Sequence, residues 1–170
     1  YRSNKSYIYR IRICVRSYLP FYLLDLFVRV PILTSTQVSK NDVKQSERIE
    51  VFDFVEKELL EACVNLPEGR SAHTGDFYGR VTLSVACFVL AKLMLNAEVY
   101  TGIPRWEDCI AYCDRIENMG YRLEDDYTTN FAVHNEISME NIWTIPMNRE
   151  LYRNQQQNII RSLHYRHAAI

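Results

Sequence analysis

Three stretches of the chain place apolar residues three and four positions apart, which is the spacing that gives a helix one apolar face. The second of them begins after Thr82, a residue suited to cap a helix N-terminus, and continues toward Gly102. The first, residues 47–64, is predicted to bury Ile49, Phe52, Val55, Leu59, Ala62 and Cys63. The third follows Gly102-Ile103-Pro104 and ends before Gly120, with an apolar stripe at Trp106, Cys109, Cys113 and Ile116 and with Tyr112 and Met119 beside it.

The second stretch is the most apolar part of the chain and raises the question of a membrane span. A spanning helix needs about 20 consecutive apolar residues, whereas the longest run here is Val85–Ala91, followed directly by Lys92. Lys92 and Asn96 are predicted to share one face, and the wide apolar face to be buried against more than one neighbour. That face contains Leu83, Ala86, Leu90, Met94 and Ala97. We therefore predict a core helix and no span.

The flanking segments carry weaker patterns. Residues 7–16 nearly alternate apolar and basic side chains, as in a strand, whereas residues 19–27 return to helical spacing with Leu23, Leu26 and Phe27 on one side. Pro20 is predicted to begin or kink this helix, and Pro31 to end it. Beyond Gly120 we expect a loop at Tyr127–His134 and a short β-like run, NIWTI, at residues 141–145.

Composition is typical of a folded domain and removes several function classes. The 170 residues are 48% apolar and 24% charged with a net charge of −1, so no overall positive field recruits nucleic acid. We interpret the local basic run Arg10, Arg12 and Arg16 as a solvated face and not as an RNA contact. The chain has no glycine-rich phosphate loop, and we expect no cofactor. No secretory signal is visible at the start, which is typical of an intracellular protein or of an internal piece of a longer one.

The five cysteines are an odd number, so at least one stays unpaired within the chain. They are Cys14, Cys63, Cys87, Cys109 and Cys113. No CxxC motif is present, and the one-turn spacing of Cys109 and Cys113 favours neither a disulfide nor a complete zinc site. We expect small apolar packing residues, with reactive thiols as the alternative.

No set of residues forms a recognisable catalytic or metal-binding motif. His164 and His167 are three apart, but no third ligand lies near them in sequence, so we predict no metal site. Asp125 and Asp126 are adjacent, which does not provide the roughly 5–10 Å separation that paired glycosidase carboxylates need. We therefore expect a solvated turn there and no catalytic residues.

Two tryptophans are candidates for stacking on a ligand. Trp106 stands at the start of the third helix and is expected to pack against the preceding helix instead. Trp143 lies in NIWTI, and its role stays open because its orientation depends on the register of that run.

The second and third helices also meet part of the tetratricopeptide spacing, in which a tyrosine precedes a small residue of the next helix by nine positions. Tyr100 and Cys109 have this separation, and Cys113 takes the aromatic position four residues later. Only Tyr100 matches by identity. The spacing supports a helical hairpin without identifying a repeat family.

Five blocks in a fixed order carry a more specific resemblance. They are FYLLDLFVRVPILTS, QSERIEVFDFVEKELLEACVNLP, YGRVTLSVACFVLAKLMLNAEVYTG, RWEDCIAYCDRIENMGYRLEDDY and ENIWTIP. In this order the chain resembles the SusD/RagB family of surface glycan- or nutrient-binding lipoproteins of Bacteroidota-type bacteria. The resemblance covers residues 19–170, as a partial SusD-like helical domain whose C-terminal remainder we expect to be absent; residues 1–18 match poorly. It makes Tyr78-Gly79-Arg80 the lead-in to the second helix.

The resemblance implies an all-α fold of tetratricopeptide-like hairpins with minor short β or loop segments, and binding without catalysis. It implies an oligosaccharide or other nutrient as ligand, and a SusC-like TonB-dependent barrel as partner, contacted largely by the helical pairs. It also implies a longer parent that is lipid-anchored at the extracellular face of the outer membrane. No residue here matches a ligand motif of the family, so the ligand-binding residues stay unassigned. The alternative is a generic tetratricopeptide-like scaffold that binds a peptide or partner helix on its concave face.

Overall fold

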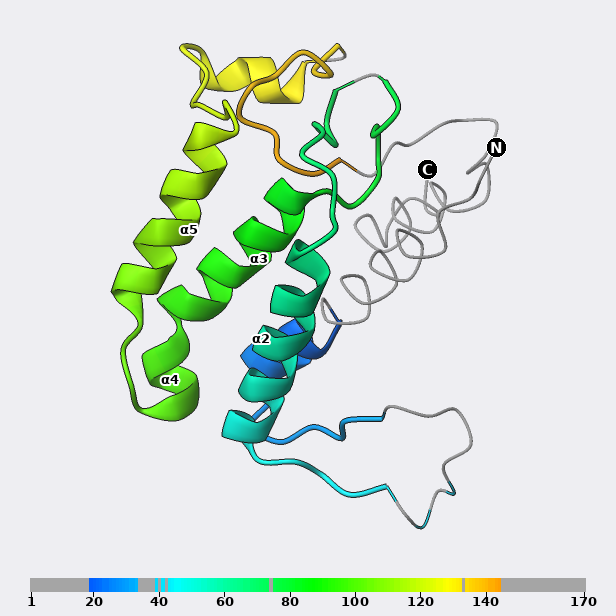
Figure 1. Ribbon diagram of the computed structural model, residues 1–170, viewed down its shortest axis with the longest axis vertical. Helices are drawn as coiled ribbons and strands as arrows, with labels where there is room; N and C mark the ends of the chain where they lie inside the picture. Colours follow the sequence, from blue (N-terminus) through cyan, green and yellow to red (C-terminus); the bar gives the residue numbers. More distant parts are fainter. Residues whose placement is uncertain are drawn as a thin grey trace, which may run out of the picture.

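The computed structural model describes residues 19–33, 43–73, 75–132 and 134–144, together with residues 39 and 41. Its elements are a helical segment at 19–26, α2 (Arg48–Cys63), α3 (Leu83–Leu95), α4 (Ala97–Thr101), α5 (Trp106–Asn118) and the 3₁₀ helix η2 (Tyr127–Phe131). These described ranges contain no β-strand beyond an isolated antiparallel bridge between Val30 and Ser46. α3 lies between α2 and α5 and packs against both (Figure 1). The predicted all-α fold is confirmed.

Helix α3 is the centre of the core because it has neighbours on two sides. Ten of its thirteen residues are buried, and each fully buried leucine contributes about 1.5–3 kcal/mol through the hydrophobic effect. The five residues predicted for its apolar face are all buried: Leu83, Ala86, Leu90 and Met94, and Ala97 just beyond it in α4. The exposed residues are Phe88, Lys92 and Leu95. Within the part of the chain that the structure describes, no helix has the length and apolar content to cross a membrane.

Thr82 stands at the predicted N-cap position of α3, but its hydroxyl does not cap the helix. Instead, Thr82 Oγ1 lies 3.0 Å from Ser84 Oγ, and Ser84 Oγ lies 2.8 Å from the hydroxyl of Tyr121. Both Thr82 and Ser84 are buried. The three hydroxyls satisfy one another, which removes the cost of burying them unpaired and joins the segment after α5 to the start of α3.

Helix α2 begins at a capping box, in which the backbone N–H of Glu47 donates to Glu50 Oε2 at 2.9 Å. Its buried face consists of Val51, Phe52, Val55, Leu59 and Ala62. Four predicted core residues of this helix are thereby confirmed. The prediction for Ile49 is wrong, because its side chain is 47% exposed. At about 100° per residue, Ile49 lies roughly 110° from the centre of the face that α3 and α4 cover. Cys63 is only partly buried.

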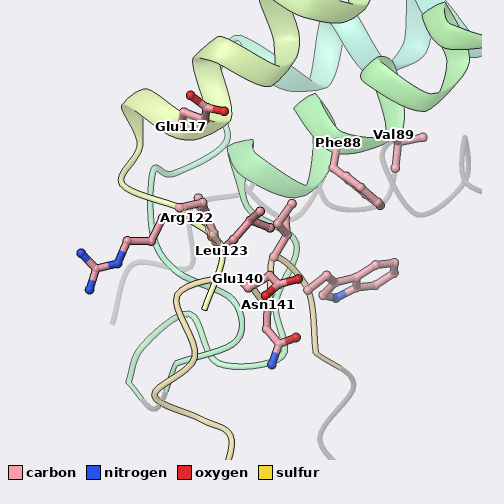
Figure 2. Close-up of a pocket in the computed structure, with 10 residues that line it drawn as sticks. Phe88, Val89, Glu117, Arg122, Leu123, Glu140 and Asn141 are labelled. Atoms are coloured by element: carbon pink, nitrogen blue, oxygen red, sulfur yellow. The ribbon is translucent and has the colours of Figure 1, made fainter. Parts of the chain in front are cut away.

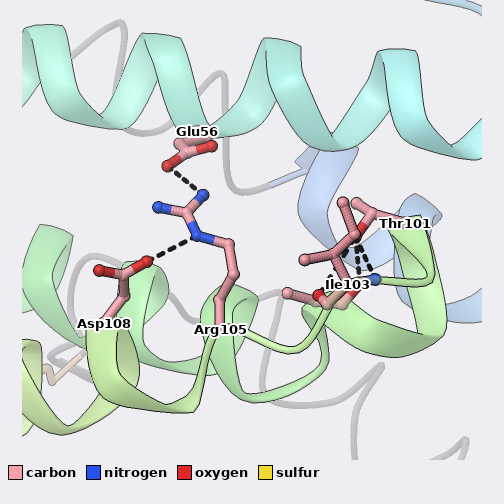
Figure 3. A network of polar contacts seen from close by, with 6 residues as sticks. Glu56, Thr101, Ile103, Arg105 and Asp108 are labelled. Atoms are coloured by element: carbon pink, nitrogen blue, oxygen red, sulfur yellow. Dashed lines mark hydrogen bonds and ion pairs between the residues drawn. The ribbon is translucent and has the colours of Figure 1, made fainter.

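The predicted second helix is interrupted at Asn96, whose backbone (φ −100°, ψ 10°) leaves the helical region between α3 and α4. Gly102 then ends α4 with a φ of +80°, which glycine adopts without strain. Thr101 Oγ1 donates to the Ala97 carbonyl at 2.8 Å and accepts from the Ile103 N–H at 3.1 Å (Figure 3). These bonds fix the tight turn into α5.

Arg105, at the N-cap of α5, joins that helix to α2 (Figure 3). Its Nη1 lies 2.6 Å from Glu56 Oε1 and its Nε 2.6 Å from Asp108 Oδ2. Only 18% of the Glu56 side chain is exposed, so this pair is less screened by water than a surface ion pair. Asp108 and Glu107 occupy the first turn, where acidic side chains interact favourably with the helix dipole.

The predicted apolar stripe of α5 is only partly correct. Ile116 is buried, and Cys109, Tyr112 and Met119 pack at the edge of the core. Trp106 is 55% exposed and Cys113 is also exposed, so the expectation that Trp106 packs against the preceding helix is wrong. The reason is that α5 packs mainly against α3, and contact mainly on one side covers a narrower face than the stripe occupies. Met119 and Gly120, the latter with a φ of +85°, end the helix where predicted.

The helical segment at 19–26 buries a different face from the predicted one. Phe21 and Leu24 are buried, whereas Leu26 and Phe27 are 68% and 55% exposed. The segment crosses the start of α2, where Arg48 Nη2 donates to the Leu24 carbonyl at 3.2 Å. That tertiary contact selects the buried face. The helix ends well before Pro31, and the predicted strand at 7–16 and its basic run lie outside the described residues.

After α5, the loop predicted at Tyr127–His134 proves to contain a short helix, and the β-like run predicted at residues 141–145 is wrong. The expected loop contains η2, whose first turn is capped by Asp126 through the N–H and hydroxyl of Thr128, at 2.9 and 2.8 Å. Residues 141–144 of the β-like run form no strand, because no neighbouring strand is present in the described chain to pair with them.

Candidate functional site

A pocket of about 570 Å³ lies between α3, the end of α5 and the segment that follows it (Figure 2). Three separate parts of the chain line it: one turn of α3, residues 117–123, and residues 140–143. The lining residues are Phe88, Val89, Glu117, Tyr121, Arg122, Leu123, Glu140, Asn141, Ile142 and Trp143. Its volume is in the range of about 300–1,000 Å³ that is usual for small-molecule sites.

The turn at the end of α5 brings the second part of the lining into place. The Gly120 N–H donates to the Glu117 carbonyl at 2.7 Å, and the left-handed Gly120 reverses the chain. Tyr121 therefore points into the core, where it is 6% exposed and its hydroxyl meets Ser84. Leu123, two residues later, is 80% exposed. The turn thus provides a pocket wall with one anchored and one open side.

Arg70, from the loop between α2 and α3, holds this wall. Its Nη2 donates to the Gly120 carbonyl at 2.6 Å and its Nη1 to Met139 Sδ at 3.4 Å. Its guanidinium also lies 4.9 Å from the centre of the Tyr121 ring, within the range of a cation–π contact. His73 of the same loop has Nε2 2.7 Å from the Ser138 carbonyl. One loop thereby fixes both segments that follow α5.

Residues 124–141 are tied together by their own polar side chains. Glu140 Oε2 accepts from the Glu124 N–H at 3.2 Å and from Asn130 Nδ2 at 2.8 Å. These donors, Asn130 first, lower the pKa of Glu140. Ser138 Oγ donates to Asn130 Oδ1 at 2.5 Å and accepts from the Asn141 N–H at 3.3 Å. The segment that carries the third part of the lining is therefore held in place by its own side-chain hydrogen bonds.

The pocket combines apolar rings with a few polar groups. Phe88 is 41% exposed, and Trp143 is half-buried beside the core. The Phe88 ring also lies 5.7 Å from Lys92 Nζ. The Arg122 side chain extends away from the other labelled residues (Figure 2). Such a site suits a neutral polar ligand with an apolar face, because the rings accept that face and amide and carboxylate groups bind its polar edge.

The residues that the sequence singled out do not assemble into one site. Trp143 lines the pocket, whereas exposed Trp106 lies by the turn that precedes α5. Asp126 caps η2 and has a lowered pKa because it accepts from the Thr128 N–H and hydroxyl, so a structural turn is confirmed there. Tyr78-Gly79-Arg80 leads into α3 as predicted, and the Gly79 N–H donates to the Ser71 carbonyl at 2.8 Å.

The histidine pair predicted not to bind a metal, His164 and His167, lies outside the described residues. Among the residues that are described, no three His, Cys, Asp or Glu side chains come together in a way that holds a metal ion.

Among the lining residues that the sequence analysis missed, Phe88 is the one that carries a recognisable signal. It interrupts an otherwise buried row in α3, and it stands one turn before Lys92, which was assigned to the polar face. An apolar ring on the polar face of a core helix is the signal that identifies it. The remaining lining residues carry no local signal, because long-range contacts of Arg70 and His73 bring them together.

The fold defines a class of helical-hairpin proteins, and the comparisons specify it. The chain is 27% identical over 117 residues to the starch-binding protein SusD of Bacteroides thetaiotaomicron, which covers 68% of this chain and 20% of that protein. A scan against models of known protein families matches none.

Solved structures share the fold. A SusD-like protein from Bacteroides fragilis superposes with a TM-score of 0.73 at 22% identity, covering 91% of this chain and 30% of that one. A laminarin-binding SusD-like protein gives 0.70 at 23% identity, covering 84% and 31%. Surface glycan-binding protein A from Bacteroides uniformis gives 0.69 at 21% identity, with the same coverage of 84% and 31%. The chain therefore spans about a third or less of the length of these relatives.

The chain is thus similar in sequence to SusD and in fold to SusD-like proteins. The relatives' names describe a starch-binding, a laminarin-binding and a surface glycan-binding protein. The SusD-like fold predicted from the five sequence blocks is confirmed, and the sequence match supports the resemblance to that family.

Proposed function

We propose that this chain is part of a glycan- or nutrient-binding surface protein that delivers its ligand to a SusC-like TonB-dependent transporter and catalyses no reaction. The observation that carries the proposal is the SusD-like fold, joined to a sequence match with a starch-binding relative. Relatives named for starch, laminarin and glycan binding make an oligosaccharide the ligand class. The proposed location is the extracellular face of the outer membrane, with a lipid anchor in a longer parent of which residues 19–170 form a helical part.

The pocket between α3 and α5 is the proposed site of sugar contact. One face of a pyranose consists of C–H groups that pack on an aromatic ring, and its hydroxyls need hydrogen-bond partners. Phe88 and Trp143 supply rings, and the Asn141 amide supplies both a donor and an acceptor. A volume of about 570 Å³ accommodates a short oligosaccharide segment.

Glu140, a carboxylate of the pocket lining, is not suited to be the proton donor of a glycosidase. A glycosidase needs one carboxylic acid whose pKa is raised so that it can donate a proton. Glu140 has the opposite property, because hydrogen bonds from Asn130 and the Glu124 N–H lower its pKa. In the pocket it acts as an ionised acceptor.

Glycan binding is tested by calorimetry and affinity gels with starch, laminarin and other glycans. Trp143→Ala is expected to weaken binding about tenfold, because a stacked ring contributes on the order of 1 kcal/mol or more. Trp106→Ala is the matched control, since this exposed ring lies at the α4–α5 turn, and its affinity should equal that of the unaltered chain. Binding that Trp143→Ala leaves unchanged would remove the pocket from the proposal. Failure to bind any glycan, also in the longer parent, would overturn the function.

One observation favours a protein-contact role as a second candidate function. From the end of α3 to the second turn of α5 the chain exposes a series of large apolar side chains, each by more than half. They are Leu95 at 57%, Val99 at 65%, Ile103 at 63%, Trp106 at 55% and Ile110 at 59%. Protein interfaces are formed from exposed apolar side chains of this kind where they lie next to one another on the surface.

In the importer this series is the proposed contact with the SusC-like barrel, and in a generic tetratricopeptide-like scaffold it binds another protein. Co-purification separates the two. The double variant Val99→Asp, Ile110→Asp should lose a barrel partner while keeping glycan affinity. A chain that recovers other proteins and no barrel, and that binds no glycan, supports the scaffold.

A further inference from the structure

Lys92 of α3 contacts aromatic rings from two separate parts of the chain. Its Nζ lies over the Phe88 ring, 5.7 Å from the ring centre, and over the Phe21 ring, 5.8 Å from that centre. Phe88 stands one turn earlier in α3, whereas Phe21 belongs to the helical segment at 19–26. Both distances are within the about 6 Å at which the face of a ring attracts a cation. The ammonium group therefore joins a ring that lines the pocket to a ring outside it.

The two rings differ in how firmly the core holds them. Phe21 is 3% exposed and belongs to the hydrophobic core, so its neighbours fix its orientation. Phe88 is 41% exposed, so fewer neighbours restrict its side-chain rotamers. Phe21 thus gives the Lys92 ammonium a fixed neighbour, and the attraction of the ammonium for the second ring favours one orientation of Phe88.

The orientation of Phe88 matters for a ligand that stacks on it. Each side chain that binding has to immobilise lowers the affinity, so a ring that already lies in the binding orientation binds more tightly. Lys92 is not one of the residues that line the pocket, so it acts on a bound molecule through Phe88. Starch and laminarin are uncharged, and the positive charge of Lys92 therefore does not attract them from a distance.

We propose that Lys92 is a positioning residue of the glycan pocket, which holds the Phe88 ring in the orientation that stacks on a sugar. This inference rests on the proposed glycan binding and adds to it a residue that lies outside the pocket. Through Phe21, it also makes the helical segment at 19–26 part of the support of the site.

The substitution Lys92→Met tests the role, because it keeps a long side chain that favours a helix and removes the charge. Calorimetry measures its affinity for soluble starch and for laminarin. We expect a loss of about two- to fivefold for whichever of the two the unaltered chain binds. Lys92→Arg should restore most of the affinity, because a guanidinium also binds over a ring. Lys57→Met, at an exposed lysine of α2, is the matched control and should leave the affinity unchanged.

A double-mutant cycle with Phe88→Leu separates positioning from any other effect of Lys92. In the Phe88→Leu chain, Lys92→Met should have no further effect, because the ring that Lys92 holds is gone. An equal loss of affinity with and without the Phe88 ring would overturn the proposal. So would a loss that Lys92→Arg does not restore, since that loss would not depend on a cation over the ring.

Nuclear magnetic resonance tests the contact itself in the full chain without a glycan. The ring currents of Phe88 and Phe21 should shift the Lys92 Hε protons upfield, and Phe88→Leu should remove part of that shift. Hε protons at the position of an unfolded lysine would overturn the proposal. If the unaltered chain binds neither glycan, the proposed function fails, and with it the role of Lys92 in binding. Glycan binding that Lys92→Met leaves unchanged overturns the role of Lys92 alone.

Discussion

Removing the hydroxyl of Tyr100 isolates the contact that holds the helical segment at 19–26 against α4. Tyr100 is 5% exposed, and its hydroxyl donates to Asp25 Oδ1 at 2.8 Å. Tyr100→Phe keeps the ring, which packs 6.3 Å from Phe52 and 5.1 Å from the Arg48 guanidinium, measured to ring centres. The substitution therefore removes one hydrogen bond and little else.

The expected loss of unfolding free energy at pH 7 is about 1–2 kcal/mol. Hydrogen bonds to charged groups contribute about 1.5–3 kcal/mol, and the lower end applies here because Asp25 is at the surface and regains water. Burial first, and then the Asp25 hydrogen bond and charge, raise the pKa of Tyr100 from 10.0 to about 12. Below pH 10 both the folded and unfolded chains keep this proton, so the stabilisation is complete.

Between pH 10 and 12 the unfolded chain loses the proton first, so the stability of the folded chain falls as the pH rises. A shift of this size corresponds to on the order of 2 kcal/mol. The stability difference between the unaltered chain and Tyr100→Phe should therefore shrink across this range.

Urea unfolding followed by circular dichroism from pH 7 to 11.5 measures this difference. Tyr127→Phe is the control, because Tyr127 is 70% exposed and its loss should change stability by less than about 0.5 kcal/mol at any pH. Asp25→Asn should make stability less dependent on pH between pH 10 and 12, because the substitution removes the charge and keeps an acceptor. Equal stability of Tyr100→Phe at pH 7, with pH curves parallel to those of the unaltered chain, would refute this account of the contact.

Two further substitutions test the core and the α2–α5 connection by the same unfolding assay. Leu90→Ala, in the fully buried centre of α3, should lower the free energy of unfolding by about 2–5 kcal/mol through the cavity that it leaves. Leu123→Ala, at a residue that is 80% exposed, should lower it by less than about 0.5 kcal/mol. A small effect at Leu90 would argue against tight packing there. Arg105→Met should cost about 1–3 kcal/mol because Glu56 keeps a largely buried charge without its partner. Arg29→Met, which breaks an ion pair whose side chains are 58% and 60% exposed, should cost under about 1 kcal/mol, and equal losses in the two variants would contradict the role given to burial.

The burial pattern of α3 could be predicted from sequence because that helix is surrounded. When neighbours cover two sides, nearly every apolar position is buried, so the predicted apolar face is correct even though the exposure of Phe88 and Leu95 was not predicted. In α5 and the segment at 19–26 the apolar residues spread over more than the covered face. In α5 Ile116 is buried and Trp106 is exposed, and in the segment at 19–26 Leu24 is buried and Leu26 is exposed. Which residue of each pair is buried depends on the side against which the neighbouring helix packs. That information is tertiary and has no local pattern.

The pocket could not be predicted for a related reason. Its walls come from three parts of the chain, and contacts spanning 50 residues from Arg70 to Gly120 and 65 residues from His73 to Ser138 bring them together. Trp143 was recognised as a candidate, but its place was assigned to a β-like run that the structure does not form. The five ordered blocks predicted the SusD-like fold because each scaffold element leaves its own local pattern. The site is a property of their assembly.

The contacts that Arg70 and His73 make with the segments after α5 bear on how the pocket can change during evolution. Two of these contacts end on backbone carbonyls, those of Gly120 and Ser138, which every amino acid provides. Substitutions at exposed rim positions such as Leu123 and Asn141 therefore leave these bonds in place. Selection can vary the chemistry of the rim while the frame beneath it stays constant, so that homologues with the same contacts are free to differ in the chemistry of the pocket.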